Sequence, residues 1–162
     1  FRASERTFQL LTQVAGRSGR GGHGGEVLIQ TYSPDHYAVS CARSHDYRGF
    51  YHREMALRRA LGYPPYSHLA RLLVTGKIER EVQEAANFLA QVVHATGLPV
   101  ELLGPAPAPL TRIKDRYRWH LVLRASGQGF LRQAAAAALG VFPGTGRYRV
   151  QVSVDIAPQS MM

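Results

Sequence analysis

The stretch RYRWHLVLR, residues 116–124, alternates regularly between two kinds of side chain. One set is apolar or aromatic, namely Tyr117, Trp119, Leu121 and Leu123. The other set holds Arg116, Arg118 and His120. Because successive side chains of a strand point to opposite faces, a period of two predicts a β-strand with one buried face. We therefore expect Trp119 in a core and the arginines on an open sheet face.

Other strand and helix patterns flank this strand in a regular order. Strands are predicted at 68–75, 100–103 and 147–156, and helices at 79–96 and 128–142. Together with 116–124 they give the order βαββαβ, which is that of a ferredoxin-like α+β domain. In that fold the first strand lies between the third and the fourth. The second strand is expected to end before the proline-rich stretch 104–109.

Basic residues recur on the predicted open face of this sheet and just before its third strand. The candidate DNA-binding residues are Arg71, Arg112, Lys114, Arg116, Arg118, Arg147 and Arg149. Such cations bind the phosphate backbone and carry no sequence information by themselves. The face lacks the aromatic residues on which an RNA-reading sheet stacks bases. We expect binding of DNA by shape and backbone, and an ordinary solvated sheet face is the alternative.

The stretch GYPPY at 62–66 marks a domain boundary, because proline removes a hydrogen-bond donor and disfavours helix before it. Upstream of it we predict, in chain order, a helix at 4–15, a glycine-rich loop at 16–25, a short strand at 26–32 and a mostly helical stretch at 35–61. The expected helix caps are Ser4, Asp35 and either Ser44 or Asp46.

Composition narrows the classes of partner. The chain has 162 residues, with 20 Lys and Arg against 11 Asp and Glu, and a net charge of +9. This balance favours a polyanionic partner, with nucleic acid first and an acidic membrane or protein second. The alternative is that the excess of arginine only solvates the surface. The single cysteine, Cys41, excludes an intrachain disulfide, and we expect it to pack in a core. The seven histidines show no ligand spacing, so we predict no metal site.

Two arginines near the N-terminus form a second candidate site. They lie in the pattern Gln13-x-x-Gly16-Arg17-x-Gly19-Arg20. A guanidinium group can donate two parallel hydrogen bonds to one phosphate and keeps its charge at all relevant pH values. A solvated loop without a ligand is the competing interpretation.

This spacing resembles motif VI of superfamily 2 helicases. The flanking stretches extend the resemblance: FRASER at 1–6, GEVLIQT at 25–31, GYPPY at 62–66, LGPAPAP at 103–109, RYRW at 116–119 and VDIAP at 154–158. In this order they resemble the C-terminal part of the primosomal replication-restart helicases, the PriA family. Ser18 and Ala157 are small departures from the family pattern.

The resemblance implies a fold and a function for each part of the chain. Residues 1–33 would be an α/β fragment from the end of the second RecA-like helicase lobe, 34–66 a helical connector, and 67–162 a ferredoxin-like domain that binds DNA and partner proteins. Members of the family are ATP-dependent 3′→5′ DNA helicases that bind stalled or branched replication forks and promote primosome assembly. The nucleotide-binding residues would be Gln13, Gly16, Arg17 and Arg20. Arg17 and Arg20 would be catalytic only in the intact protein.

The resemblance also implies cofactors and partners. ATP and Mg²⁺ would act in the intact protein, and zinc would be bound upstream of this chain. Since no G-x-x-x-x-G-K-[ST] loop is present, this chain alone should not hydrolyse ATP and should hold no cofactor.

The expected partners are forked DNA, single-stranded DNA-binding protein and other primosome proteins, with no membrane. Arg132 and Gln133 are candidates for binding a partner's acidic tail. The expected location is the bacterial cytoplasm, in association with the nucleoid. A non-catalytic fork-binding scaffold with a degenerate motor is the alternative function.

Overall fold

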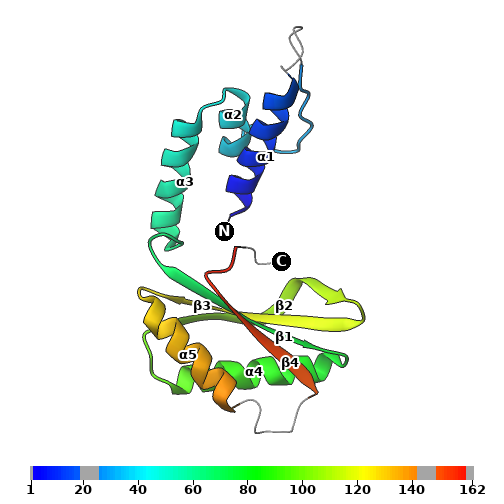
Figure 1. The fold of residues 1–162 in the computed structure, drawn as a ribbon, viewed down its shortest axis with the longest axis vertical. Coiled ribbons are helices and arrows are strands. Elements are labelled where there is room, and N and C mark those ends of the chain that lie inside the picture. The colour runs from blue at the N-terminus through cyan, green and yellow to red at the C-terminus, as the bar shows by residue number, and fades with distance from the viewer. Residues whose placement is uncertain (1, 19–25, 142–148, 160–162) are drawn as a thin grey trace. The chain divides into compact units, whose positions relative to one another are not determined.

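Two compact units make up the chain, Phe1–Gly62 and Tyr63–Met162 (Figure 1). The computed structural model describes residues 2–18, 26–141 and 149–159. The division falls within the predicted boundary stretch, 62–66.

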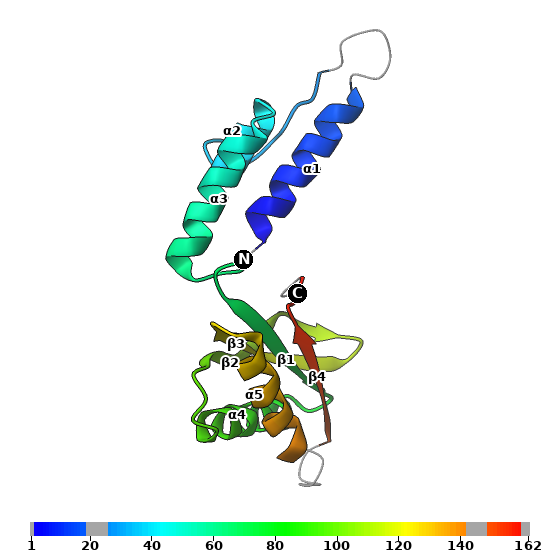
Figure 2. The ribbon, with the colours of Figure 1, turned by 60° about the vertical axis from the view of Figure 1, so that its left-hand side comes forward.

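The first unit contains the helices α1 (Ala3–Ser18), α2 (Tyr37–Arg43) and α3 (Tyr47–Leu61). Figure 2 shows α1 and α3 running beside each other, and α2 contacts both. The helical prediction for 35–61 is confirmed. Of the two predicted caps for α3, Asp46 is the one that caps it: its carboxylate accepts a hydrogen bond from the Gly49 N–H at 2.8 Å, whereas Ser44 follows the end of α2. Gly62 ends α3 with a φ of 62°, a left-handed conformation that glycine adopts at little cost.

The other cap predictions in this unit were wrong. The residue that caps α2 is His36 rather than Asp35, and its Nδ1 accepts from the Ala38 N–H at 3.2 Å. Ser4 lies inside α1, which begins one residue earlier at Ala3. Several residues near a helix start can cap it, and packing rather than propensity selects the one that does.

A small aromatic core holds the three helices together. The Phe8 ring of α1 stacks on the Phe50 ring of α3 with their centroids 4.3 Å apart. Cys41 of α2 is buried in the same cluster, as predicted. Apolar burial of these side chains and the stacking of their rings stabilise the unit.

Two predictions upstream of α2 were also wrong. Residues 26–32 do not form a strand, and the Leu28 side chain is 94% exposed. A strand needs neighbours that pair with its backbone, and the described part of this unit holds only helices and irregular segments.

Gly16 and Arg17 belong to α1 instead of the predicted loop, and Arg17 lies in its last turn, where a cation suits the helix dipole. Residues 19–25 lie outside the described part of the chain.

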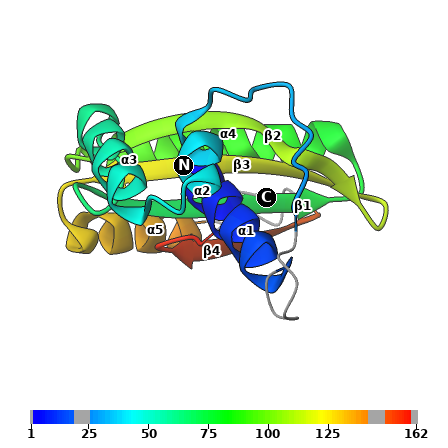
Figure 3. The same cartoon turned by 90° about the horizontal axis from the view of Figure 1, so that it is seen from above.

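The second unit has the predicted order βαββαβ. Its elements are β1 (His68–Gly76), α4 (Glu79–Ala95), β2 (Glu101–Ile113), β3 (Arg116–Ala125), α5 (Gln128–Val141) and β4 (Val150–Ile156). The strands form one sheet in the order β2-β3-β1-β4, with every neighbouring pair antiparallel. Figures 1 and 3 show α4 and α5 on the same side of this sheet, which leaves its other side as the open sheet face.

The core of this unit lies between the sheet and its two helices. The fully buried side chains in it include Leu72, Val74, Val82, Leu89, Leu121, Leu123 and Leu131. Trp119 and Tyr117 are partly buried and pack against this core, as the alternation predicted. One contiguous core therefore spans all six elements of the unit.

The predicted end of β2 was wrong. The strand continues through the proline-rich stretch to Ile113 instead of ending at Leu103. Proline lacks an N–H and is tolerated in edge strands and at bulges. Strand β2 is at the edge of the sheet, and its register with β3 shifts between Leu103 and Ala106 and again between Pro107 and Arg112. An edge strand with these register shifts can therefore contain prolines, although the sequence pattern predicted that the prolines would end it.

Candidate functional site

Strand register places several arginines together on the open sheet face. Arg71 of β1 lies opposite Val122 of β3 on one side and Asp155 of β4 on the other. Arg118 of β3 lies opposite Thr75 of β1. These residues are out of phase with the core residues Leu72 and Leu121, which pair with each other and point toward the helices. The open face thus carries Arg71, Arg116 and Arg118, from two central strands.

Each of these guanidinium groups is held by an internal partner. Arg71 lies 3.6 Å from the Asp155 carboxylate. Arg116 donates to the Thr75 carbonyl oxygen at 3.2 Å, and Arg118 donates to the Leu110 carbonyl oxygen at 3.1 Å. A guanidinium group has five N–H donors, and these contacts orient it on the open sheet face.

Two residues of this face were missing from the predicted set. Arg124 continues the alternation of β3 and forms an ion pair with Glu101 at 2.6 Å. His120 lies between Arg118 and Val122 on the same strand, opposite Leu73 of β1 and Ala106 of β2. The period of two had already placed His120 on this face, though not as a binding residue, and extended to position 124 it also places Arg124 there.

The environment of His120 is unusual for a histidine on a sheet surface. Burial lowers its pKa below the ordinary value of 6.5, and the positive charges of Arg71 and Arg118 lower it further. The Nδ1 atom of His120 is buried and has no hydrogen-bond partner among the described residues. His120 is therefore held in its neutral form at the centre of a basic surface.

The remaining DNA-binding candidates lie elsewhere in the second unit. Arg112 pairs in register with Tyr117, which faces the core. The guanidinium carbon of Arg112 lies 5.2 Å from the centroid of the Tyr117 ring. The Asp115 carboxylate lies 2.9 Å from the same guanidinium group. Lys114 occupies the β2–β3 turn and is exposed, with a φ of 48°. Arg149 is exposed directly before β4, and Arg147 lies outside the described residues.

The partner-binding candidates Arg132 and Gln133 are both exposed on α5. Because α5 covers the opposite side of the sheet, these two residues belong to a different surface from the open sheet face (Figure 3). The structure thus separates the two candidate surfaces.

The motif at the end of α1 is placed only in part. Gln13 and Arg17 are four residues apart on α1, so both lie on one side of the helix, and both are exposed. Gly16 has open space around the position of a Cβ atom. Arg20 lies outside the described residues, so its position relative to Arg17 stays a prediction.

A groove of about 490 Å³ runs between α1 and α3 beside this motif. Its floor is aromatic and includes Phe8, Tyr47 and Phe50, and Gln13 is one of the polar residues that line it. No signal in the sequence joined Gln13 to Tyr47 and Phe50, since these two residues lie more than 30 positions away.

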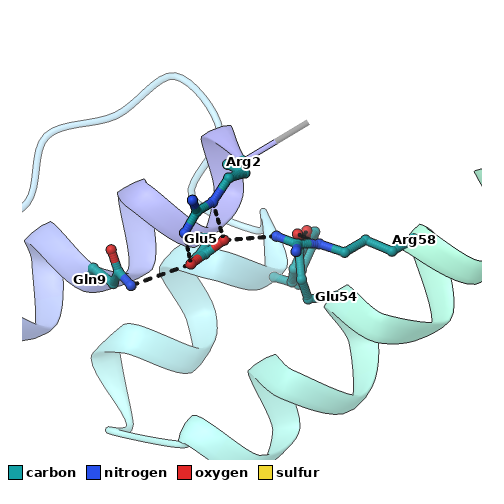
Figure 4. Close-up of polar contacts among 6 residues, drawn as sticks. Arg2, Glu5, Gln9, Glu54 and Arg58 are labelled. Atoms are coloured by element: carbon teal, nitrogen blue, oxygen red, sulfur yellow. Dashed lines mark hydrogen bonds and ion pairs between the residues drawn. The ribbon is translucent and has the colours of Figure 1, made fainter. Parts of the chain in front are cut away.

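An ion cluster closes one end of the groove and ties α1 to α3 (Figure 4). The Glu5 carboxylate accepts from Arg2 at 2.7 Å and from Arg58 at 2.8 Å, and Arg58 also bonds Glu54 at 2.7 Å. The hydrogen bond from Arg2, followed by that from Arg58, lowers the pKa of Glu5 to about 2. The Tyr37 hydroxyl donates to Glu54 and extends the cluster to α2. The helix that carries Gln13 and Arg17 is therefore anchored by charge as well as by its aromatic core.

Two features are absent from the residues that the structure describes. No helix there is long and apolar enough to cross a membrane. No group of three or more potential metal-ligating side chains occurs in the same part of the chain.

Comparison with known proteins assigns the family. The family model described as the primosomal protein N C-terminal domain matches residues 59–159, which include every strand of the sheet. The chain therefore belongs to this family, and it matches the C-terminal part of the replication restart protein PriA.

Several curated relatives carry that name, including one from Bacillus subtilis and one from Synechocystis. Replication restart protein PriA of Bacillus subtilis is 40% identical over 167 residues, covering 100% of this chain and 20% of the relative. The Synechocystis protein of the same name is 46% identical over 126 residues, covering 76% of this chain and 15% of the relative. This chain thus spans a fifth or less of the length of these two relatives. A de novo designed protein, Foldit4, has a TM-score of 0.42 at 11% identity over 55% of this chain and 96% of its own, which is too low to bear on the fold.

Proposed function

We propose that this chain is the C-terminal region of an ATP-dependent 3′→5′ DNA helicase that binds stalled or branched replication forks and promotes primosome assembly and replication restart. The relatives named replication restart protein PriA support this role. Residues 1–33 form the end of a RecA-like lobe and 34–66 a connector. The second unit is a ferredoxin-like domain, supported by its order βαββαβ and by the strand order β2-β3-β1-β4.

The observation that carries the proposal is the set of guanidinium groups on the open sheet face. Arg71, Arg116, Arg118 and Arg124 lie there within the described residues, against the carboxylates of Glu101 and Asp155. The excess of positive charge attracts a phosphate backbone, and DNA binding releases the counterions condensed on it. The internal contacts of each arginine fix its guanidinium group before DNA arrives, which reduces the entropy lost on binding.

The second part of the proposal concerns ATP. Arg17 is exposed at the end of α1, where its guanidinium group can reach a phosphate bound outside this chain. ATP and Mg²⁺ supply the phosphoryl group and neutralise its charge. Arg17 and Arg20 donate to the phosphate oxygens. Gln13 lines the groove between α1 and α3. The ion cluster at Glu5 and Arg58 keeps α1 in place while these contacts form.

DNA binding is tested by fluorescence anisotropy with a labelled forked DNA and the full chain, at two salt concentrations. The double variant R116Q/R118Q removes two cations of the open face. The matched control is Arg80→Gln, since Arg80 is an exposed arginine on α4, on the helix-covered side of the sheet. If each arginine neutralises one phosphate, the slope of log K against log salt decreases by about 2 in the double variant and stays unchanged in the control. Equal slopes in all three proteins would falsify DNA binding by this face.

The ATP role is tested in the intact protein with Arg17→Ala. We expect loss of most ATP hydrolysis, because an arginine at the transferred phosphate is worth roughly 10³–10⁵ in rate. Binding of forked DNA should survive. An unchanged turnover number would remove Arg17 from the nucleotide site.

A further inference from the structure

Among the described residues of the open sheet face, His120 is the group whose charge can change near neutral pH. It lies on the central strand β3, two residues from Arg118 and diagonally across from Arg71 of β1. Side chains in such positions on one sheet face lie about 5–8 Å apart, within reach of a shared ligand. Both arginines act electrostatically on the His120 ring.

The hydrogen bonding of His120 is incomplete in the described structure. Its Nδ1 atom is buried without a partner, although buried polar atoms in folded proteins are almost always satisfied. A neutral histidine tolerates this state better than a charged one, because an unpaired lone pair costs less than a buried, unpaired positive charge. An imidazole beside two guanidinium groups therefore stays neutral until an anion approaches.

We propose that His120, Arg71 and Arg118 form a phosphate-binding site on the open sheet face, at which binding of one backbone phosphate of nucleic acid is coupled to protonation of His120. This rests on the proposed binding of DNA by that face, and it adds a residue and a pH dependence to it. The phosphate supplies negative charge between the two guanidinium groups and so removes the repulsion that keeps the imidazole neutral. One proton from solvent then binds the ring, and no covalent bond changes.

The charged groups around His120 determine the direction in which a bound phosphate shifts the pKa of its ring. On β1 the charged neighbour is Arg71, and on β3 it is Arg118. The residue of β2 that pairs with His120 is Ala106, which is uncharged. Asp155 of β4 lies one strand further away and faces Arg71. Glu101 is paired with Arg124 at the other end of β3. Helices α4 and α5 cover the opposite side of the sheet.

The same arrangement of charges predicts how the affinity for the phosphate depends on pH. Without ligand, His120 titrates below 6.5, and with a phosphate bound its midpoint moves upward. Between the two midpoints binding takes up a proton, so affinity increases as pH falls, by up to about tenfold per pH unit for one coupled proton. At pH values below the lower midpoint or above the upper one, His120 no longer makes the affinity for the phosphate depend on pH.

The test uses the full chain and an oligothymidylate with hydroxyl ends. Its phosphodiesters keep one charge each across this pH range, so that any pH dependence belongs to the protein. The histidine ring signals are followed by NMR between pH 5 and 8.5, with and without the oligonucleotide, and backbone-to-ring correlations assign the His120 signal. Affinity is measured over the same range for the unmodified chain, H120Q and the control H94Q, since His94 is exposed on α4.

The expected result has three parts. The midpoint of His120 moves upward when the oligonucleotide binds, H120Q loses part of the pH dependence of affinity, and H94Q keeps it. In addition, Arg118→Gln raises the midpoint of His120 in the free chain, because one repelling charge is gone. That measurement, like the midpoint shift, does not require a stable H120Q protein.

Each contrary result has a distinct meaning. Binding with an unmoved His120 midpoint, or with the same pH dependence in H120Q and the unmodified chain, overturns the coupling and leaves DNA binding intact. Absence of oligonucleotide binding at every pH overturns the proposed DNA binding together with the coupling.

Discussion

The two units of this chain are stabilised in different ways. The second unit has one contiguous core between a four-stranded sheet and two helices, with seven large side chains that are fully buried. The first unit has a small core centred on Phe8 and Phe50, and an ion cluster joins its helices at one end. Leu10, Val14 and Leu57 of its helices are about half exposed.

The comparison shows how each unit positions its candidate site. Strand register alone aligns the arginines of the open sheet face, because the sheet is fixed by its core. The α1 motif depends on contacts between residues far apart in the chain, such as Glu5 and Arg58. We therefore expect the first unit to be more sensitive to loss of charge, and the second to loss of apolar volume.

The largest effect is expected from Leu121→Ala in the second unit. Leu121 is fully buried on β3, and removing its side chain leaves a cavity, so the free energy of unfolding should fall by about 3–5 kcal/mol. Urea unfolding followed by the fluorescence of the single tryptophan, Trp119, reports this unit. Leu103→Ala is the matched control on β2, because Leu103 is 40% exposed and should cost less than about 1 kcal/mol. Similar losses in both variants would contradict the assigned core.

A smaller effect is expected from Glu5→Gln in the first unit. The substitution removes the carboxylate that bridges Arg2 and Arg58, which should cost about 1–2 kcal/mol because the cluster is partly solvated. Amide hydrogen exchange of α1 and α3 measures the change. Glu84→Gln is the control, since the Arg80–Glu84 pair is exposed and should contribute less than about 0.5 kcal/mol. Unchanged exchange in α1 would show that the aromatic core alone holds the helix.

The two units should also respond to acid in different pH windows. The pKa of Glu5 is lowered from 4.5 to about 2, so its stabilisation is present above pH 4.5 and is lost as pH falls toward 2. The pKa of His120 is lowered from 6.5, so the unfolded state binds its proton first and the second unit loses stability as pH falls below 6.5. Urea midpoints for Trp119 fluorescence between pH 7 and 5, with H120Q for comparison, test this order. A pH-independent midpoint in the unmodified chain would contradict it.

The smallest effect, and one of opposite sign, is expected at the β2–β3 turn. Lys114 and Asp115 have φ values of 48° and 56°, in the left-handed region that favours asparagine and glycine. The double variant K114N/D115G should raise the free energy of unfolding by about 0.5–1 kcal/mol, because it relieves strain at both positions. The Arg112–Asp115 ion pair that it removes is exposed and contributes little. A decrease in the Trp119 urea midpoint would show that this pair outweighs the strain.

Much of the second unit was predictable from the sequence. The alternation in 116–124 identified β3, its buried face and the open position of Arg116 and Arg118. The order βαββαβ followed from local patterns in the same way. The length of β2 did not, because proline signals an end to a strand unless the strand lies at an edge, and edge position is a property of the whole sheet.

The sequence by itself determined the order βαββαβ, the buried face of β3 and the excess of positive charge, because these depend on residues close together in the chain. Tertiary structure alone decided which charges meet. It joined Glu5 to Arg58 across 53 positions, paired Arg124 with Glu101, and set His120 between Arg118 and Arg71. Pairing over such separations depends on how the helices and strands pack, and local propensity carries no information about it.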